Sequence, residues 1–203
     1  MTAISADPLN LVICGVGGQG NILLSGMLGS AFLKKGYYAT IGETFGAAQR
    51  GGAVFSSVRV SKNREYGPLM PEGKAHLVLG LEPLETLRMV QKYGNAEAVC
   101  ISNTYPVVTA GVSANRDSYP DLEELKKAVS ELSKQAWFLD ATSIALELQA
   151  PITMNIVMVG ALLGTQQLPL DVEDIKAELR ESLPPDRLEL NFEALSRGIK
   201  AVS

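Results

Sequence analysis

The stretch Leu9–Gly20, LNLVICGVGGQG, and the residues after it, NILLSGMLGSAFLKK at 21–35, decide the fold class. The short apolar run at 9–14 predicts a buried parallel strand. Four glycines then form a tight loop, and apolar residues recur at helical spacing until Gly36, which is typical of a helix C-cap. A strand, a glycine loop and a helix in this order predict the first unit of an α/β fold.

The rest of the chain continues this alternation. Strands are predicted at 37–42, 53–60, 75–80, 96–102 and 137–139, and helices at 83–93, 122–135, 141–148, 153–163, 171–183 and 187–202. Strands that alternate with helices predict a three-layer α/β/α sandwich with a mainly parallel sheet. The chain from about residue 141 is expected to be helical, and 203 residues fit one domain over 1–203.

The connection between the second and third strands, residues 43–52, interrupts this pattern. A parallel crossover needs about a dozen residues or more, usually with a helix. The third strand is therefore expected to be antiparallel or displaced, which makes the sheet mixed. The fold is Rossmann-like at its start and departs after one βαβ unit.

Composition excludes several classes of protein. Hydrophobic residues are 46% of the chain, which excludes disorder as its main state, and a net charge of −4 argues against a broad nucleic-acid surface. Cys14 and Cys100 are too few for a disulfide framework or for an iron–sulfur cluster, which needs about four thiolates. One histidine, His76, argues against an all-protein zinc site.

The sequence has neither the features of a secretory signal nor those of a membrane span. The first ten residues have neither a basic nor an apolar signal region, and the longest apolar stretch, 152–163, is shorter than the about 20 residues of a membrane span. We expect a cytoplasmic protein.

The glycine loop is the first candidate site, through Gly17, Gly18, Gln19 and Gly20. Glycines allow close backbone approach, and the start of the following helix offers N–H groups and a positive dipole to an anion. Glu43 follows Gly20 by 23 positions, about where an acidic residue holds a ribose hydroxyl in NAD enzymes. Two interpretations stay open: a nucleotide-binding loop, or a tight turn that binds nothing.

The short connection at 43–52 is the second candidate site. If the first two strands are parallel, both loops lie at the carboxyl edge of the sheet, where α/β proteins bind ligands. An arginine fork beside glycine N–H groups and neutral hydrogen-bonding side chains predicts an anion cradle, or a surface for a partner that carries an anion. The residues concerned are Glu43, Thr44, Gln49, Arg50, Gly51 and Gly52. The alternative is that Arg50 pairs with Glu43 inside the loop.

Three segments together carry a resemblance to a known family. They are GVGGQG at 15–20, GETFGAAQRGGAVFSSVR at 42–59 and TMNIVMVGALLG at 153–164. In this order they resemble the γ-type component of 2-oxoacid:ferredoxin oxidoreductases, and among these the small (beta) subunit of indolepyruvate ferredoxin oxidoreductase. The resemblance covers nearly the whole chain and implies one pyruvate/ketoisovalerate oxidoreductase γ-type domain over 1–203.

The resemblance implies an enzyme subunit. Members of the family oxidatively decarboxylate a 2-oxoacid, here indolepyruvate or another arylpyruvate, to an acyl-CoA and reduce ferredoxin. Thiamine diphosphate, Mg and 4Fe-4S clusters are expected on a large (alpha) subunit, because this chain lacks a Gly-Asp-Gly element and enough cysteines. The small subunit would carry no redox centre, complete the active site on the CoA side, meet ferredoxin through its partner and be inactive alone.

Carried over position by position, the resemblance implies ligand- or partner-facing residues and no metal ligand, and it leaves the catalytic residues unassigned. They are Gly17, Gly18, Gln19, Gly20, Gln49, Arg50, Gly51, Gly52 and Asn155. Asn155 has a second interpretation, because a polar residue in the first turn of a helix also satisfies backbone groups there. A surface meant for a partner also allows the isolated chain to form a homodimer.

Two further residues have a chemical and a structural interpretation. His76 could act as a general base, but the absence of a recognisable partner favours a structural role. Cys14 could be a reactive thiol, but a core position is favoured. Met154 and Met158 predict packing on one helix face. For the whole chain, a stand-alone NAD- or FAD-binding protein and a non-catalytic scaffold remain the alternatives.

Overall fold

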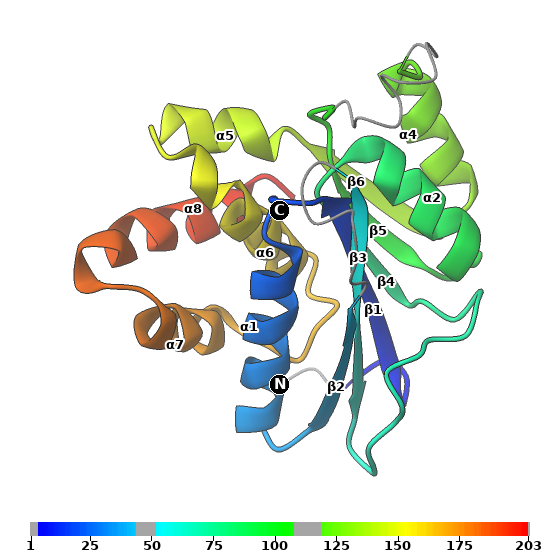
Figure 1. Cartoon of the computed structure of the whole chain (residues 1–203), viewed down its shortest axis with the longest axis horizontal. Helices are drawn as coiled ribbons and strands as arrows, with labels where there is room; N and C mark the ends of the chain where they lie inside the picture. The colour runs from blue at the N-terminus through cyan, green and yellow to red at the C-terminus, as the bar shows by residue number, and fades with distance from the viewer. Residues whose placement is uncertain (1–3, 44–51, 108–118, 203) are drawn as a thin grey trace.

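The computed structural model describes residues 4–43, 52–107 and 119–202, and within them a six-stranded sheet (Figure 1). The strands follow the order β2-β3-β1-β4-β5-β6 across the sheet. Their bounds are β1 Leu9–Val16, β2 Tyr38–Glu43, β3 Ala53–Ser61, β4 Leu77–Gly80, β5 Val99–Asn103 and β6 Gln135–Leu139. The helices are α1 Asn21–Lys34, α2 Pro83–Tyr93, α4 Leu122–Glu131, α5 Ala141–Glu147, α6 Met154–Gly164, α7 Val172–Ser182 and α8 Leu188–Lys200.

The direction of β3 confirms the prediction of a mixed sheet. It lies between β1 and β2 and is antiparallel to both, whereas β1, β4, β5 and β6 pair in parallel. The reason is the short connection before Ala53, which cannot hold a crossover helix. Because β3 is antiparallel to both neighbours, β1 and β2 run in the same direction and end at the same edge of the sheet.

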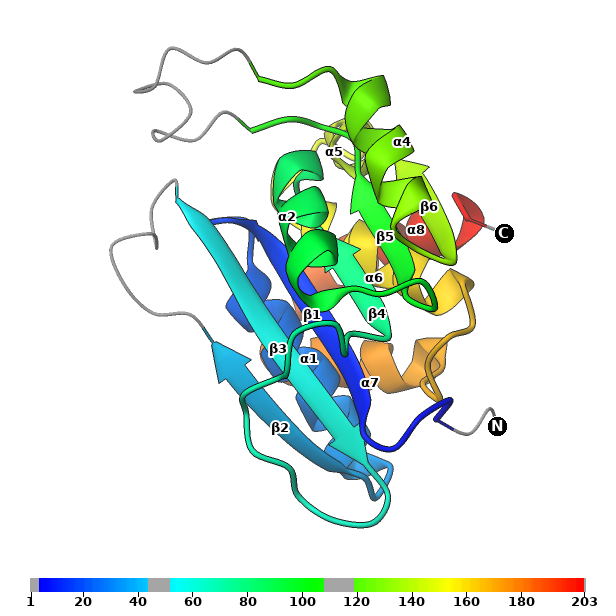
Figure 2. The ribbon, with the colours of Figure 1, turned by 90° about the vertical axis from the view of Figure 1, so that its right-hand side faces the viewer.

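Helices cover both faces of the sheet, as the three-layer prediction required. Figures 1 and 2 show α2 and α4 on one face, and α1 and α5–α8 on the other. Successive side chains of β1 point to opposite faces. Leu11 and Ile13 join the core under α1 and α6, and Val12 and Cys14 join a smaller core under α2.

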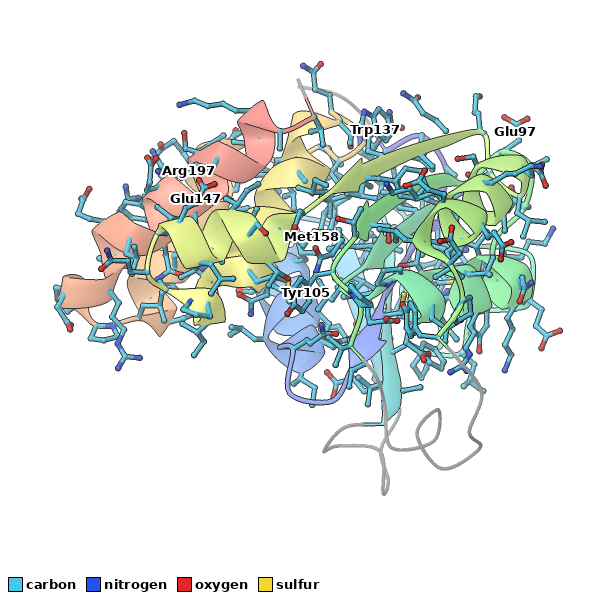
Figure 3. The ribbon with its side chains drawn as sticks, turned by 90° about the horizontal axis from the view of Figure 1, so that it is seen from above. Glu97, Tyr105, Trp137, Glu147, Met158 and Arg197 are labelled. Atoms are coloured by element: carbon cyan, nitrogen blue, oxygen red, sulfur yellow. The ribbon has the colours of Figure 1, made fainter. Side chains whose placement is uncertain are left out.

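Helix α6 forms the centre of the larger core. Its residues from Met154 to Leu163 are all buried, and a helix that is apolar all round must be enclosed on all sides. Met158 lies inside this layer (Figure 3), which confirms the predicted packing of the two methionines. On the surface beside it, Arg197 of α8 pairs with Glu147 of α5 at 3.0 Å.

Several predicted boundaries were wrong by a few residues, and tertiary pairing explains the largest shift. The helix expected over 122–135 ends at Glu131, and Gln135 starts β6 because it pairs with Val99 of β5. Strands β4 and β5 begin at Leu77 and Val99, later than predicted. A 3-10 turn, Pro151–Thr153, precedes α6. In the described ranges, no helix is long and apolar enough to cross a membrane.

His76, just before β4, has the structural role that the sequence favoured. Its Nδ1 accepts a hydrogen bond from the Asn10 N–H at 3.0 Å, and its own N–H donates to the Asn10 carbonyl at 2.9 Å. The imidazole therefore joins the start of β1 to the segment that leads into β4.

This role predicts a loss of stability in mild acid. Burial, and then the positive charge of Lys74, lower the pKa of His76 in the folded state. The unfolded chain takes up this proton near pH 6.5, so the contribution of His76 is complete above that pH and declines as the pH falls below it. Denaturant unfolding should show the decline, and His76→Gln should remove it. An NMR titration of this single histidine that gave a pKa above about 6.5 would contradict the prediction.

Candidate functional site

The glycine loop lies at the carboxyl edge of the sheet and touches the end of the second candidate loop. The Gly17 N–H donates to the Gly52 carbonyl at 2.8 Å, and Val16 pairs with Ala53 where β1 and β3 meet. Gly52 and Glu43 bracket the second loop. Of its predicted site residues, Thr44, Gln49, Arg50 and Gly51 lie outside the described residues. The described ends of both loops therefore lie on one edge, as the parallel arrangement of β1 and β2 predicted.

Gln19 fixes the shape of the glycine loop. Its Oε1 accepts from the Val16 N–H at 2.7 Å, and its Nε2 donates to the Leu81 carbonyl at 3.1 Å. Both polar ends of this side chain are thus used within the fold. Gln19 joins the loop to the end of β4.

The start of α1 leaves hydrogen-bonding groups available. Gly20 caps the helix with no side-chain hydrogen bond, and within the described chain the N–H groups of Asn21, Ile22 and Leu23 have no backbone acceptor. The Asn21 amide donates to the Ile13 carbonyl at 3.2 Å, while its buried Oδ1 has no partner among the described residues. The site therefore offers several donors, and beside them lies a buried acceptor with no partner among the described residues. Sequence reasoning missed both, although Asn21 directly follows the glycine loop.

A cavity of about 330 Å³ opens beside the glycine loop. Its volume falls within the about 300–1,000 Å³ usual for small-molecule sites. Its walls combine the backbone of the loop, apolar side chains, the carboxylate of Glu43 and the hydroxyl of Ser56. The lining residues are Gly17, Gly18, Gly20, Asn21, Ile22, Glu43, Val54, Phe55 and Ser56. The Glu43 Oε1 accepts from the Ser25 hydroxyl at 3.1 Å, which ties β2 to α1.

Asn155 comes to this edge from the first turn of α6. It is buried and lies against Gly20, where an added Cβ would collide with its Nδ2. The structure thus brings Gly20 and Asn155 together from positions 135 residues apart in the sequence. Asn155 therefore has a structural contact with the glycine loop, at the edge where the resemblance places a ligand or a partner.

The two left-handed glycines should differ in their tolerance of alanine. Gly18 has φ +104° with open space around it, whereas Gly20 has φ +94° and packs on Asn155. Gly18→Ala should cost about 1–2 kcal/mol from backbone strain alone, and Gly20→Ala about 1–3 kcal/mol more from the collision. Urea unfolding measures both. Equal losses would show that Asn155 moves aside freely.

The strand order disfavours the dinucleotide interpretation of Glu43. In the standard dinucleotide-binding fold, the strand that carries the acidic residue is adjacent to the first strand. Here β3 lies between them, so the ends of β1 and β2 are two strand spacings, about 10 Å, apart. Glu43 faces the cavity across β3.

The cysteines do not fit an iron–sulfur cluster on this chain. Cys14 and Cys100 are both buried, and burial raises the pKa of each thiol, that of Cys100 to about 11. An iron–sulfur cluster is coordinated by about four cysteines in the deprotonated thiolate form. Among the described residues, no group of three or more His, Cys, Asp or Glu side chains could hold a metal ion.

Comparison with known proteins identifies the family. Residues 10–201 match the family model described as pyruvate ferredoxin/flavodoxin oxidoreductase. The chain belongs to the pyruvate ferredoxin/flavodoxin oxidoreductase family. As a member of this family it is an oxidoreductase subunit, which confirms the resemblance that the three sequence segments carried.

Curated relatives match the chain over almost its full length. It is 39% identical to "Indolepyruvate oxidoreductase subunit IorB" of Pyrococcus horikoshii and to the protein of the same name of Thermococcus kodakarensis, each over 95% of both chains. It is 31% identical to "NADH-dependent phenylglyoxylate dehydrogenase subunit gamma" of Aromatoleum evansii, over 93% of this chain and 91% of that protein.

Solved structures of the family share the fold. The pyruvate oxidoreductase subunit PORC from Thermotoga maritima matches with a TM-score of 0.68 at 20% identity, over 96% of this chain and 97% of that one. The 2-oxoglutarate:ferredoxin oxidoreductase from Magnetococcus marinus, solved with 2-oxoglutarate, coenzyme A and succinyl-CoA bound, matches with a TM-score of 0.76 at 19% identity. The match covers 98% of this chain but 31% of that longer one.

Proposed function

We propose that this chain is the small subunit of a 2-oxoacid:ferredoxin oxidoreductase that oxidatively decarboxylates an aromatic 2-oxoacid, of which indolepyruvate is the first candidate, to an acyl-CoA. The observation that carries the proposal is the 39% identity to indolepyruvate oxidoreductase subunits along nearly the whole chain. The relative named for phenylglyoxylate supports the class, because indolepyruvate and phenylglyoxylate both join an aromatic ring to a 2-oxoacid.

The proposal assigns the electron-transfer chemistry to a large partner subunit. Thiamine diphosphate with Mg would supply the decarboxylation there, and 4Fe-4S clusters would pass electrons to ferredoxin. Three features of this chain support that division of labour. It has two buried thiols, its sequence lacks a Gly-Asp-Gly element, and the described residues hold no candidate metal site.

An exposed apolar patch beside the glycine loop is the proposed contact with that partner. Ile22 and Leu23 lie in the first turn of α1 and are 57% and 47% exposed, and Ile152 is 81% exposed. Leu23 and Ile152 share a small cavity with Asn155, which itself lies against Gly20. The patch is therefore continuous with the carboxyl edge, and exposed apolar groups that adjoin a site are typical of a protein interface.

The cavity beside the glycine loop is the proposed contact with coenzyme A, and its chemistry favours the pantetheine arm over a phosphate. The N–H groups at the start of α1 that have no backbone acceptor among the described residues would donate to carbonyl oxygens of the ligand. A pantetheine arm supplies such oxygens in its amides and matches the apolar wall of Ile22, Val54 and Phe55. The Glu43 carboxylate on the same wall would repel a phosphate.

Reconstitution tests the proposal. The chain is co-expressed with the large subunit encoded in the same organism, and reduction of a dye is measured with indolepyruvate, phenylglyoxylate, pyruvate and 2-oxoglutarate. We expect co-purification, turnover that depends on both subunits and on coenzyme A, and highest kcat/KM for the aromatic substrates. Failure to co-purify or to add activity would refute it, and tight stoichiometric binding of NAD or FAD by the isolated chain would favour the stand-alone alternative.

A further inference from the structure

Glu82 is a buried carboxylate that the proposed contacts with the partner and with coenzyme A leave unused. It follows β4 at the carboxyl edge, is 1% exposed and caps α2, where its Oε2 accepts from the Glu85 N–H at 2.9 Å. A helix cap needs one such bond, and serine, threonine or aspartate supplies it more commonly. The cap uses only Oε2, so the burial of Oε1 must have another role.

The other oxygen of Glu82 holds two residues that are far from it in the sequence. The Val107 N–H donates to Oε1 at 3.3 Å, and the Tyr119 hydroxyl donates to the same oxygen. The Tyr119 hydroxyl in turn accepts from the Leu84 N–H at 3.3 Å. Val107 and Tyr119 are the described residues on either side of 108–118, so one oxygen atom holds both ends of that connection against the start of α2.

The residue before Glu82 connects this cluster to the glycine loop. The Leu81 carbonyl accepts from the Gln19 Nε2 and from the Asn103 Nδ2, each at 3.1 Å. Asn103 ends β5, and its Oδ1 accepts from the Ala141 N–H at 3.1 Å, at the start of α5. The dipeptide Leu81-Glu82 is therefore where the glycine loop, the end of β5 and the starts of α2 and α5 are joined.

The donors around Glu82 require a carboxylate rather than an amide. Within the described part of the chain, its three hydrogen bonds come from neutral donors, the N–H groups of Glu85 and Val107 and the hydroxyl of Tyr119. An ionised carboxylate accepts at both oxygens, and hydrogen bonds to a charged acceptor are stronger than neutral ones. A glutamine of the same shape would turn an NH₂ donor toward one of these donors and lose that bond.

Burial and the hydrogen bond to Glu82 both raise the pKa of Tyr119, which keeps its hydroxyl protonated as a donor. Glu85, the other buried carboxylate of this turn, is paired elsewhere, with Arg88 at 2.6 Å. The carboxylates of the two glutamates therefore have different partners, and only the Glu85 N–H contacts Glu82.

We propose that Glu82 is a positioning residue that holds Val107 and Tyr119 at the carboxyl edge and so sets the edge beside the glycine loop for coenzyme A. The inference rests on the proposed function for its readout in the enzyme. The anchoring of Val107 and Tyr119 by Glu82 concerns this chain alone and does not depend on the proposed function. Glu82 acts through the backbone and hydroxyl groups that it holds and not by contact with a substrate.

The test compares Glu82→Gln and Tyr119→Phe with Glu85→Gln as the matched control. Tyr119→Phe keeps the helix cap and removes one hydroxyl, so it remains informative if Glu82→Gln folds poorly. In the isolated full chain, amide exchange at Val107 should become about tenfold faster in Glu82→Gln, because its hydrogen bond then goes to a neutral amide oxygen or is lost. Glu85→Gln should leave that exchange unchanged.

In the co-expressed enzyme, Glu82→Gln and Tyr119→Phe should raise KM for coenzyme A by up to about tenfold while kcat changes by less than about twofold. A general loss of folding would instead lower the apparent kcat through the fraction of active enzyme. Unchanged Val107 exchange in Glu82→Gln would overturn the anchoring. Faster exchange with an unchanged KM would overturn the positioning role. A wild-type complex without turnover would refute the proposed function, and the exchange comparison would still decide the anchoring.

Discussion

Replacing Gly198 by alanine is expected to lower the free energy of unfolding by about 3 kcal/mol, although alanine is the better helix former. Gly198 of α8 lies against the backbone of α6, where an added Cβ would come within 2.8 Å of the Val157 carbonyl carbon and 2.9 Å of the Ala161 nitrogen. Gly160 of α6 meets the Leu195 backbone in the same way. Because backbone atoms cannot move aside as a flexible side chain can, the two helices must separate.

Gly26→Ala is the matched control, since Gly26 also lies within a helix but has nothing within 4 Å of an added Cβ. This variant should gain about 0.5–1 kcal/mol from helix propensity. Thermal unfolding should show a fall of about 6–12 °C for Gly198→Ala and a small rise for Gly26→Ala. Similar melting temperatures for the two variants would mean that α6 and α8 do not pack as closely as the structure has them.

Replacing Leu23 by glutamate is expected to weaken binding of the proposed partner subunit by about 30-fold, the loss of one well-buried apolar contact of about 2 kcal/mol. Leu23 lies in the apolar patch beside the glycine loop and is 47% exposed in the isolated chain. A glutamate at the first turn of α1 suits the helix dipole, so the fold should tolerate the change. Co-purification and calorimetric titration with the large subunit measure the effect.

Leu33→Glu provides the comparison within the same helix. Leu33 is 57% exposed and lies ten residues further along α1, about 15 Å away and toward the opposite edge of the sheet. Its replacement should leave the affinity within about twofold of wild type. Equal weakening by the two variants would show that the partner covers the whole length of α1 rather than the carboxyl edge.

Local pattern predicted most of the elements correctly because their signals are local. The apolar run before Gly15 and the helical spacing after Gly20 required no distant contact to be recognised, and β1 and α1 begin where these signals begin. The reversal of β3 was also predictable, because the length of a connection limits the crossover that it can hold. The start of β6 at Gln135 was missed, because pairing with β5 determined it against the helical pattern of the preceding residues.

The candidate site was predictable to the level of the loops but not of their contacts. The order of strand, glycine loop and helix identified Gly17 to Gly20, and the resemblance brought in Asn155. That Asn155 packs on Gly20, or that Glu82 holds both Val107 and Tyr119, depends on chain segments that approach only after folding. Gln19 shows the same limit, because its contact with the Leu81 carbonyl uses the polar groups that the sequence offered to a ligand.

The sequence by itself determined the alternation of elements, the mixed sheet, the family and the lack of enough thiols for a cluster, because these depend on composition, short-range periodicity and segment lengths. Only the tertiary structure decided which side chains meet at the carboxyl edge and which acceptor there lacks a partner among the described residues, as the Asn21 Oδ1 does. The physical reason is that a hydrogen bond is satisfied or orphaned within tenths of an ångström, and the packing of distant segments sets that distance.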